Sequence, residues 1–197
     1  MNTVQTSVDS TAKNTALAGA AEPGDHWIEV LRNGTHVVIR PIHKQDVELE
    51  RRFIEGLSPR SRHFRFLEAM RSPSEALLRQ LTAIDPSTDA AYVALIAVGA
   101  EKREIGVARF SAQPDGKDCE FAITVSDEWQ HKGLGTLMMQ HLIAVARARG
   151  IESMYSSDAS DNDLMRKFAE HLHFQHRRDP KDGTQVLYTV DLKTARV

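Results

Sequence analysis

A strand, a short glycine-containing loop and a long apolar helix follow one another between residues 118 and 149, and this unit constrains the fold most. Side chains alternate along 118–125, so that Cys119 and Phe121 fall on one face of the expected strand and Glu120 on the other. Along 136–149 the polar residues form one narrow stripe, and such a helix packs most of its surface against a sheet. The unit therefore predicts a domain of the α/β class.

The remaining apolar periods and turn residues predict one mixed α/β domain. Strands are expected at 35–42, 92–98, 104–111, 118–125, 151–157, 173–176 and 185–192, and helices at 43–56, 60–67, 74–82, 136–149 and from Asp161 or Asn162 to about His171. Short connections between the three middle strands favour an antiparallel meander. The expected architecture is a mostly antiparallel mixed sheet of about six to seven strands, flanked by about four to five helices.

Length and charge restrict the number of domains and the kinds of partner. The chain has 197 residues, which is enough for one well-packed domain or at most two small ones. Its 25 basic and 27 acidic residues give a formal net charge of −2, which argues against binding of duplex nucleic acid, because that affinity comes mainly from neutralised phosphates. Residues 1–24 contain no aromatic residue and are expected to be a disordered tail, so that the folded domain spans 25–197.

The expected location is the cytoplasm. A single cysteine, Cys119, can form no internal disulfide, which fits a reducing compartment. The longest apolar run, Ala90–Ala100, is far shorter than the ~20 residues that a bilayer helix needs. Residues 1–24 lack the basic start and continuous apolar core of a signal peptide. We therefore expect no membrane partner.

The loop between the strand and the helix has the composition of an anion-binding site. Gly133 and Gly135 leave the backbone uncovered, so that a charged group could approach the amide hydrogens at the helix N-terminus. Each amide hydrogen bond to a charged group contributes ~1.5–3 kcal/mol, whereas the helix dipole contributes only ~0.3–1 kcal/mol. The nucleotide-hydrolase motif Gly-x4-Gly-Lys-Ser/Thr is absent, and Met138 stands where a dinucleotide fingerprint has its third glycine.

The loop contains Gln130-x-x-Gly133-x-Gly135, which resembles the acetyl-CoA pyrophosphate motif (Gln/Arg-x-x-Gly-x-Gly/Ala) of the GNAT superfamily of N-acetyltransferases. Its position at a strand-to-helix junction after a meander agrees with the resemblance, which covers about 35–192. The segments 120–135 and 57–66, the latter with Leu57-Ser58-Pro59-x-Ser61-Arg62 and Arg65-Phe66, look most like the acetyltransferase domain of bacterial protein-lysine acetyltransferases. The resemblance implies a single GNAT-like domain.

The resemblance also implies a role for each matching residue. The backbone of Val125, at the end of its strand, would contact the pantetheine arm and polarise the thioester carbonyl. Asn162, at the start of the next helix, would hydrogen-bond the pantetheine or the leaving thiol. The pyrophosphate loop would consist of Gln130, His131, Lys132, Gly133, Leu134, Gly135 and Thr136. One departure is Ala169, which stands where many family members have a tyrosine as general acid.

Glu120 is the candidate general base. It shares its strand face with the small residues Ala122 and Thr124, which leaves room for a substrate. A lysine amine of pKa ~10.4 requires roughly 4.6 kcal/mol to be neutral at pH 7. A carboxylate that takes this proton, directly or through a water, would promote attack of the amine on the thioester. The alternative is a solvated or salt-bridged strand glutamate.

The sequence therefore predicts an enzyme that moves the acetyl group of its co-substrate acetyl-CoA to a primary amine. A protein lysine is the favoured acceptor, and a small-molecule amine is the alternative. A further alternative is a non-catalytic acyl-CoA-binding sensor module. A third class, a nucleic-acid-associated regulator, would use Arg60, Arg62 and Arg65, which could also contact a phosphate or an acidic acceptor, or form a solvated helix face.

Two further features concern metals and subunits. His171, His173 and His176 have a spacing that suggests a metal site, but no cysteine or Glu-x-x-His framework accompanies them. Surface or packing histidines are therefore favoured, and no metal is expected. The apolar segment 186–190 could pair between subunits, and we expect either a monomer or a homodimer.

Overall fold

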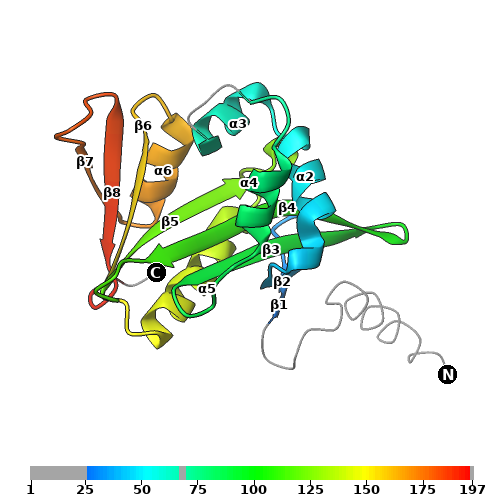
Figure 1. Ribbon diagram of the computed structural model, residues 1–197, viewed down its shortest axis with the longest axis horizontal. Coiled ribbons are helices and arrows are strands. Elements are labelled where there is room, and N and C mark those ends of the chain that lie inside the picture. Colours follow the sequence, from blue (N-terminus) through cyan, green and yellow to red (C-terminus); the bar gives the residue numbers. More distant parts are fainter. Residues whose placement is uncertain (1–25, 67–69, 196–197) are drawn as a thin grey trace.

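Eight strands form one mixed sheet at the centre of the structure (Figure 1). They are β1 (Trp27–Val30), β2 (His36–Pro41), β3 (Asp89–Val98), β4 (Glu101–Ala112), β5 (Asp118–Val125), β6 (Ser153–Ala159), β7 (Gln175–Arg178) and β8 (Gln185–Asp191). Their order is β1-β2-β3-β4-β5-β6-β8-β7, and all neighbours are antiparallel except β5 and β6. This computed structural model describes residues 26–66 and 70–195, and the expected tail at 1–24 lies outside them. The mostly antiparallel mixed sheet is confirmed, with one strand more than expected.

The additional strand is β1, which pairs with β2 across a tight turn. Asn33 Oδ1 accepts the N–H of Thr35 at 3.2 Å, and Gly34 adopts a φ of 80°, so the Asn-Gly pair forms the turn. β1 has only 4 residues, and Ile28 and Val30 are exposed. Its sequence therefore lacks the buried apolar pattern by which a strand is recognised.

Helices cover both faces of the sheet, close to where the sequence predicts them (Figure 1). They are α2 (Val47–Gly56), α3 (Pro59–Phe66), α4 (Glu75–Thr82), α5 (Leu134–Ala148) and α6 (Asp163–His171), with short 3-10 helices η1 (Lys44–Asp46) and η2 (Asp127–Trp129). α2 and α4 pack on one face, in a cluster of buried side chains that includes Val93 and Val107. α5 and α6 pack on the other face, in the larger cluster.

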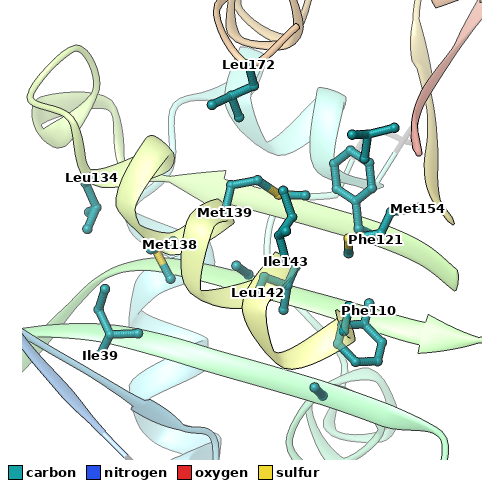
Figure 2. Packing of buried hydrophobic residues seen from close by; sticks show 14 of the residues in the cluster. Ile39, Phe110, Phe121, Leu134, Met138, Met139, Leu142, Ile143, Met154 and Leu172 are labelled. Atoms are coloured by element: carbon teal, nitrogen blue, oxygen red, sulfur yellow. The ribbon is translucent and has the colours of Figure 1, made fainter. Parts of the chain in front are cut away.

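The larger cluster anchors α5 on the sheet (Figure 2). The side chains of α5 that are almost completely buried there include Met138, Met139, Leu142 and Ile143. Burying a side chain of this size stabilises the fold by ~1.5–3 kcal/mol, so the start of α5 is held firmly. Cys119 lies in the same cluster, and burial raises the pKa of its thiol to about 12. The thiol therefore stays protonated and is a packing group.

Buried charged groups lie on the opposite face, between α2 and the sheet. Arg40 of β2 donates to the two oxygens of Asp46 at 2.7 and 2.8 Å, and Asp46 also accepts the N–H of His43 at 2.8 Å. Burial alone would raise the pKa of Asp46, but the hydrogen bonds from Arg40 and His43 outweigh it, and the pKa is lowered. This ion pair fixes the start of α2 against β2.

Glu50 of α2 and Glu104 of β4 are a second buried pair on this face, with exposed fractions of 1% and 4%. Arg109 lies near them, with its Nη2 3.9 Å from Glu50 Oε1. Burial, and then the negative charge of Glu50, raise the pKa of Glu104 well above its ordinary value. The folded protein therefore keeps a proton on Glu104 at pH values where the unfolded chain has lost it.

Replacing Glu104 with glutamine is expected to stabilise the protein near pH 7. Because the folded state binds the extra proton, the stability of the wild type falls as the pH rises above about 4.5, the ordinary value of this group, toward the raised pKa. Each unit of raised pKa costs ~1.4 kcal/mol, and 1 kcal/mol shifts Tm by ~2–4 °C at this size. Glutamine cannot ionise, so thermal unfolding should show a Tm several degrees higher at pH 7.

The same comparison near pH 4.5 should show a smaller difference between the variant and the wild type. Glu101, at the exposed start of the same strand, provides the matched control, and Glu101→Gln should leave Tm unchanged. An unchanged or lower Tm for Glu104→Gln at pH 7 would contradict the expected stabilisation.

β5 and β6 separate after a short parallel ladder. They pair only at Asp118–Ser153, Cys119–Met154 and Glu120–Tyr155, and then run apart (Figure 1). On its other side β6 pairs with β8, and β8 also pairs with β7. The segment 186–190 therefore lies inside the sheet, and the expectation that it could pair between subunits is wrong. The outermost strands of the sheet are β1 and β7.

Candidate active site

A cleft of about 700 Å³ lies where β5 and β6 separate. Clefts of this size bind small molecules and cofactors. The end of β5, the loop 126–136, α3 and the first turns of α6 line it. Of the residues predicted from the sequence, those that line the cleft are Glu120, Val125, Gln130, His131, Gly133, Gly135, Thr136 and Asn162. Lys132 and Leu134 are adjacent to this set but do not line the cleft.

The loop before α5 presents a run of unpartnered backbone amides. Within the described part of the chain, no backbone N–H from His131 to Thr136 has a hydrogen-bond acceptor. Gly133 is the N-cap of α5 with a φ of 89°, and His131 also has a positive φ, of 60°. A Cβ on Gly135 would lie 3.4 Å from Cε2 of Phe168, so the glycine keeps this surface open. Free N–H groups at the N-terminus of a long helix form an anion-binding site.

Other loop residues hold the loop in shape. Gln130 Nε2 donates to the carbonyl oxygen of Val125 at 3.1 Å, so Gln130 closes the loop in addition to lining the cleft. The Nζ of Lys132 lies 4.6 Å from the ring centroid of Trp129, a cation–π contact. The side chain of Leu134 is buried in the core, so only its backbone amide is available to a ligand.

Asn162 has a structural role at the N-terminus of α6. Its Oδ1 accepts the N–H of Met165 at 3.2 Å, and its Nδ2 donates to Oδ2 of Asp158 at 3.0 Å. Asp158 lines the cleft and also accepts the N–H of Ala159 at 2.7 Å. Burial raises the pKa of Asp158, although these two hydrogen bonds act in the opposite direction. Direct contact of Asn162 with a ligand stays a prediction.

Glu120 lies on the wall of the cleft that faces α3. Ser61, Phe64 and Arg65 of α3 line the same cleft. Burial, and then the charge of Arg109, lower the pKa of Arg65 to about 10, while Glu120 acts in the opposite direction, so the guanidinium keeps its charge at neutral pH. The side chain of Glu120 is exposed and therefore accessible to a substrate that enters the cleft.

The three arginines of α3 have separate positions. Arg62 donates to the carbonyl oxygens of Leu57, at 3.1 Å, and of Arg71, so it holds the ends of α3 to the neighbouring chain. Arg60 is exposed, and Arg65 lines the cleft. Of the three, Arg65 is therefore the one placed to contact a ligand in the cleft.

Arg32 lines the cleft although nothing in the sequence singled it out. It follows β1, and its Nε would lie 3.6 Å from a Cβ built on Gly133. Its guanidinium makes no hydrogen bond or ion pair with any other described residue. No local pattern identifies Arg32, because only the folded sheet brings it beside a loop so distant in the sequence.

The three histidines also have separate positions. His171 lines the cleft, His173 follows α6 with a positive φ of 57°, and His176 lies on the outer strand β7. In the described ranges, 26–66 and 70–195, no group of three or more His, Cys, Asp or Glu side chains is arranged to hold a metal ion. No helix in those ranges has the length and apolar character needed to cross a bilayer.

Comparison with known proteins places this geometry in a family. The model of the acetyltransferase (GNAT) family matches residues 60–174. A Pseudomonas aeruginosa protein named Acetyltransferase PA5475 is 46% identical over 175 residues, which are 89% of this chain and 94% of that protein. Acetyltransferase Pat of Mycolicibacterium smegmatis is 30% identical over 143 residues, which are 72% of this chain but 42% of that protein.

A solved structure shows the same fold. The crystal structure of the GNAT domain of S. lividans PAT superposes with a TM-score of 0.78, covering 87% of this chain and 99% of that domain at 24% identity. The family model spans more than half of the chain, and the Pseudomonas relative is similar over nearly its full length. The chain therefore belongs to the GNAT family and is an acetyltransferase.

Proposed function

We propose that this protein transfers the acetyl group of acetyl-CoA to a lysine side chain of a protein. The observation that carries the proposal is that the free amides before α5 and the carboxylate of Glu120 line one cleft. Such a transferase needs a group that holds the donor and a group that serves the acceptor, side by side. The likeness of segments 57–66 and 120–135 to bacterial protein-lysine acetyltransferases supports lysine over a small-molecule amine.

The residues of the cleft fit acetyl-CoA. Its diphosphate is an anion, for which the amides of 131–136 and the guanidinium of Arg32, which has no partner among the described residues, provide donors and positive charge. Gly133 and Gly135 let this group approach the backbone closely. Beyond Glu120, β5 has no pairing with β6, which leaves backbone groups on that edge for the amides of the pantetheine arm, while the carbonyl oxygen of Val125 already accepts Gln130 Nε2.

Acetyl-CoA supplies a thioester whose carbonyl carbon is open to attack by an amine. In this mechanism Glu120 accepts the proton that the lysine amine gives up, directly or through one water, and such general-base catalysis contributes ~10²–10⁴-fold. Ala169 is fully buried and offers no proton donor. A thiol of pKa ~8.5 leaves readily as a thiolate, so water can protonate it.

Calorimetric titration with acetyl-CoA, followed by an acceptor screen, tests the proposal. Amino-blocked lysine peptides and a panel of small amines are incubated with the enzyme and acetyl-CoA, and acetylated products are identified by mass spectrometry. Acetylated lysine peptides are expected. Acetylation of the small amines alone would contradict the lysine acceptor, and binding without transfer to any amine would identify a sensor module. Absence of binding would remove both functions.

Replacing Arg32 with alanine is expected to weaken acetyl-CoA binding about ten-fold. A hydrogen bond between charged groups contributes ~1.5–3 kcal/mol, of which water recovers part because Arg32 is exposed. Calorimetry should show a higher Kd for Arg32→Ala, an intermediate Kd for Arg32→Lys, and the wild-type Kd for Arg79→Ala, an exposed arginine of α4 outside the cleft. Equal Kd values for Arg32→Ala and the wild type would show that Arg32 makes no contact with a phosphate.

A further inference from the structure

The position of α3 depends largely on polar contacts. α3 has no fully buried side chain, and its apolar contact with the core is one half-buried residue, Phe66, whereas α2, α4 and α5 each bury several side chains. Yet α3 supplies Ser61, Phe64 and Arg65 to the cleft, on the side of Glu120. A helix with so little apolar packing needs other contacts to hold it against the rest of the domain.

Besides Phe66 and the hydrogen bonds of Arg62, one carboxylate, Asp127, holds the first turn of α3. Its Oδ2 accepts the N–H of Ser58 at 2.9 Å, and its Oδ1 accepts the hydroxyls of Ser58 and Ser61, both at 2.7 Å. The Ser58 Oγ also accepts the N–H of Ser61 at 3.1 Å and so caps α3. Burial alone would raise the pKa of Asp127, but the hydrogen bonds from Ser58 and Ser61 outweigh it and lower that pKa. The tether, Asp127 with Ser58 and Ser61, is therefore a charged hydrogen-bond network at neutral pH.

Asp127 belongs to the segment that joins β5 to α5. It stands two residues after Val125, and its carbonyl oxygen accepts the N–H of Gln130 at 3.4 Å. The segments 57–66 and 120–135, which are far apart in the sequence, are thus joined through their serine and aspartate side chains. The same short stretch of backbone carries both the free amides of the loop and the anchor of α3.

We propose that Asp127 is a positioning residue that transmits cofactor binding at loop 126–136 to α3, the wall on which the acceptor docks. The proposal rests on the proposed function for its donor and acceptor. A ligand that orders the loop fixes Asp127, and Asp127 in turn fixes the first turn of α3 and the side chains that flank Glu120. Acetyl-CoA therefore prepares the acceptor side of the cleft before the acceptor arrives.

Hydrogen–deuterium exchange of the full chain tests this step with acetyl-CoA as the probe. In the wild type, acetyl-CoA should slow exchange both in loop 126–136 and in α3. In Asp127→Asn, which presents an amide N–H₂ to donor groups, α3 should exchange about ten-fold faster without ligand. Acetyl-CoA should then slow exchange in the loop alone. Kd for acetyl-CoA should stay within about two-fold, while KM for amino-blocked lysine peptides rises about ten-fold.

Asp182→Asn is the matched control. Asp182 also accepts three hydrogen bonds, from Thr184 N–H, Thr184 Oγ1 and Gln185 Nε2, but it lies between β7 and β8, outside the cleft. This variant should leave exchange in α3, Kd and KM unchanged. If Asp127→Asn does not fold, Ser61→Ala removes one bond of the tether and should give a smaller change of the same kind.

The outcomes separate this proposal from the proposed function. If α3 of the ligand-free Asp127→Asn protein exchanges at the same rate as in the wild type, the tether is overturned, whether or not acetyl-CoA binds. Normal binding of acetyl-CoA with no response of α3 in the wild type overturns the transmission and leaves the proposed function intact. No binding of acetyl-CoA to the wild type overturns the proposed function, and the transmission with it. If Ser61→Ala is the variant used, an unchanged exchange rate in α3 of the ligand-free protein overturns the tether.

Discussion

Replacing Glu120 with glutamine should lower kcat by ~10²–10⁴-fold, because the amide cannot accept the proton that the attacking amine loses. Glutamine is nearly isosteric with glutamate, and Glu120 makes no salt bridge in the described part of the chain, so the fold should be unaffected. Kd for acetyl-CoA, measured by calorimetry, should stay at the wild-type value, since the donor binds at the loop. Initial rates with a lysine peptide measure the loss.

Glu101→Gln, at the far end of the β3–β4 hairpin, is the matched control and should keep wild-type kinetics. The residual rate of Glu120→Gln should rise with pH up to the amine pKa of ~10.4, because the amine must then lose its proton to water. Near-wild-type kcat for Glu120→Gln would assign Glu120 to the alternative of a solvated strand glutamate. The base would then have to be sought among other groups of the cleft.

Replacing Gly135 with glutamate should abolish measurable binding of acetyl-CoA, with a loss of more than ~100-fold. The new side chain would begin 3.4 Å from Phe168 and 3.8 Å from Val125, and would have to extend into the cleft. Its negative charge would lie beside the amides that the diphosphate needs. Calorimetric titration of the variant and the wild type measures the difference.

Gly135→Ala separates the charge from the shape of the side chain. A Cβ at this position meets its neighbours at ordinary contact distances, and φ of Gly135 is not in the left-handed region, so alanine should bind acetyl-CoA within about ten-fold of the wild type. Unchanged thermal unfolding would show that both variants are folded. Binding by Gly135→Glu at wild-type strength would place the diphosphate elsewhere and remove the assignment of this loop.

The elements around the cleft could be predicted because their signals are local. The alternation at 118–125 and the apolar helix after Gly133 are patterns of two and 3.6 residues that hold within one stretch of chain. The buried charges could not be predicted in this way. Arg40 lies in the strand predicted at 35–42, and Glu104 begins the strand predicted at 104–111. Both side chains are buried on the face of the sheet that α2 covers.

The residues of the candidate site also divide into those with a local sequence signal and those without one. The loop residues are contiguous, so one motif predicted them together, and the strand period placed Glu120 on the face of Ala122 and Thr124, which also line the cleft. Arg32 and Asp127 carry no such signal, because their partners are Gly133 in one case and Ser58 and Ser61 in the other. For Asn162, the family resemblance indicated the position, and the structure shows that its side chain caps the N-terminus of α6.

The narrow junction between β5 and β6 has a consequence for the lifetime of the protein. Among the described residues, the strand group β6-β8-β7 pairs with the rest of the sheet at three positions, beside which Glu152 and Ser153 donate to the carbonyl oxygen of Lys117, so these two parts share little backbone hydrogen bonding. Under the proposed function, acetyl-CoA would touch both parts and stabilise the folded chain by ~2.7 kcal/mol at a concentration of 100 Kd. Susceptibility to proteases would then follow the supply of acetyl groups, and the enzyme would persist longest when its substrate is abundant.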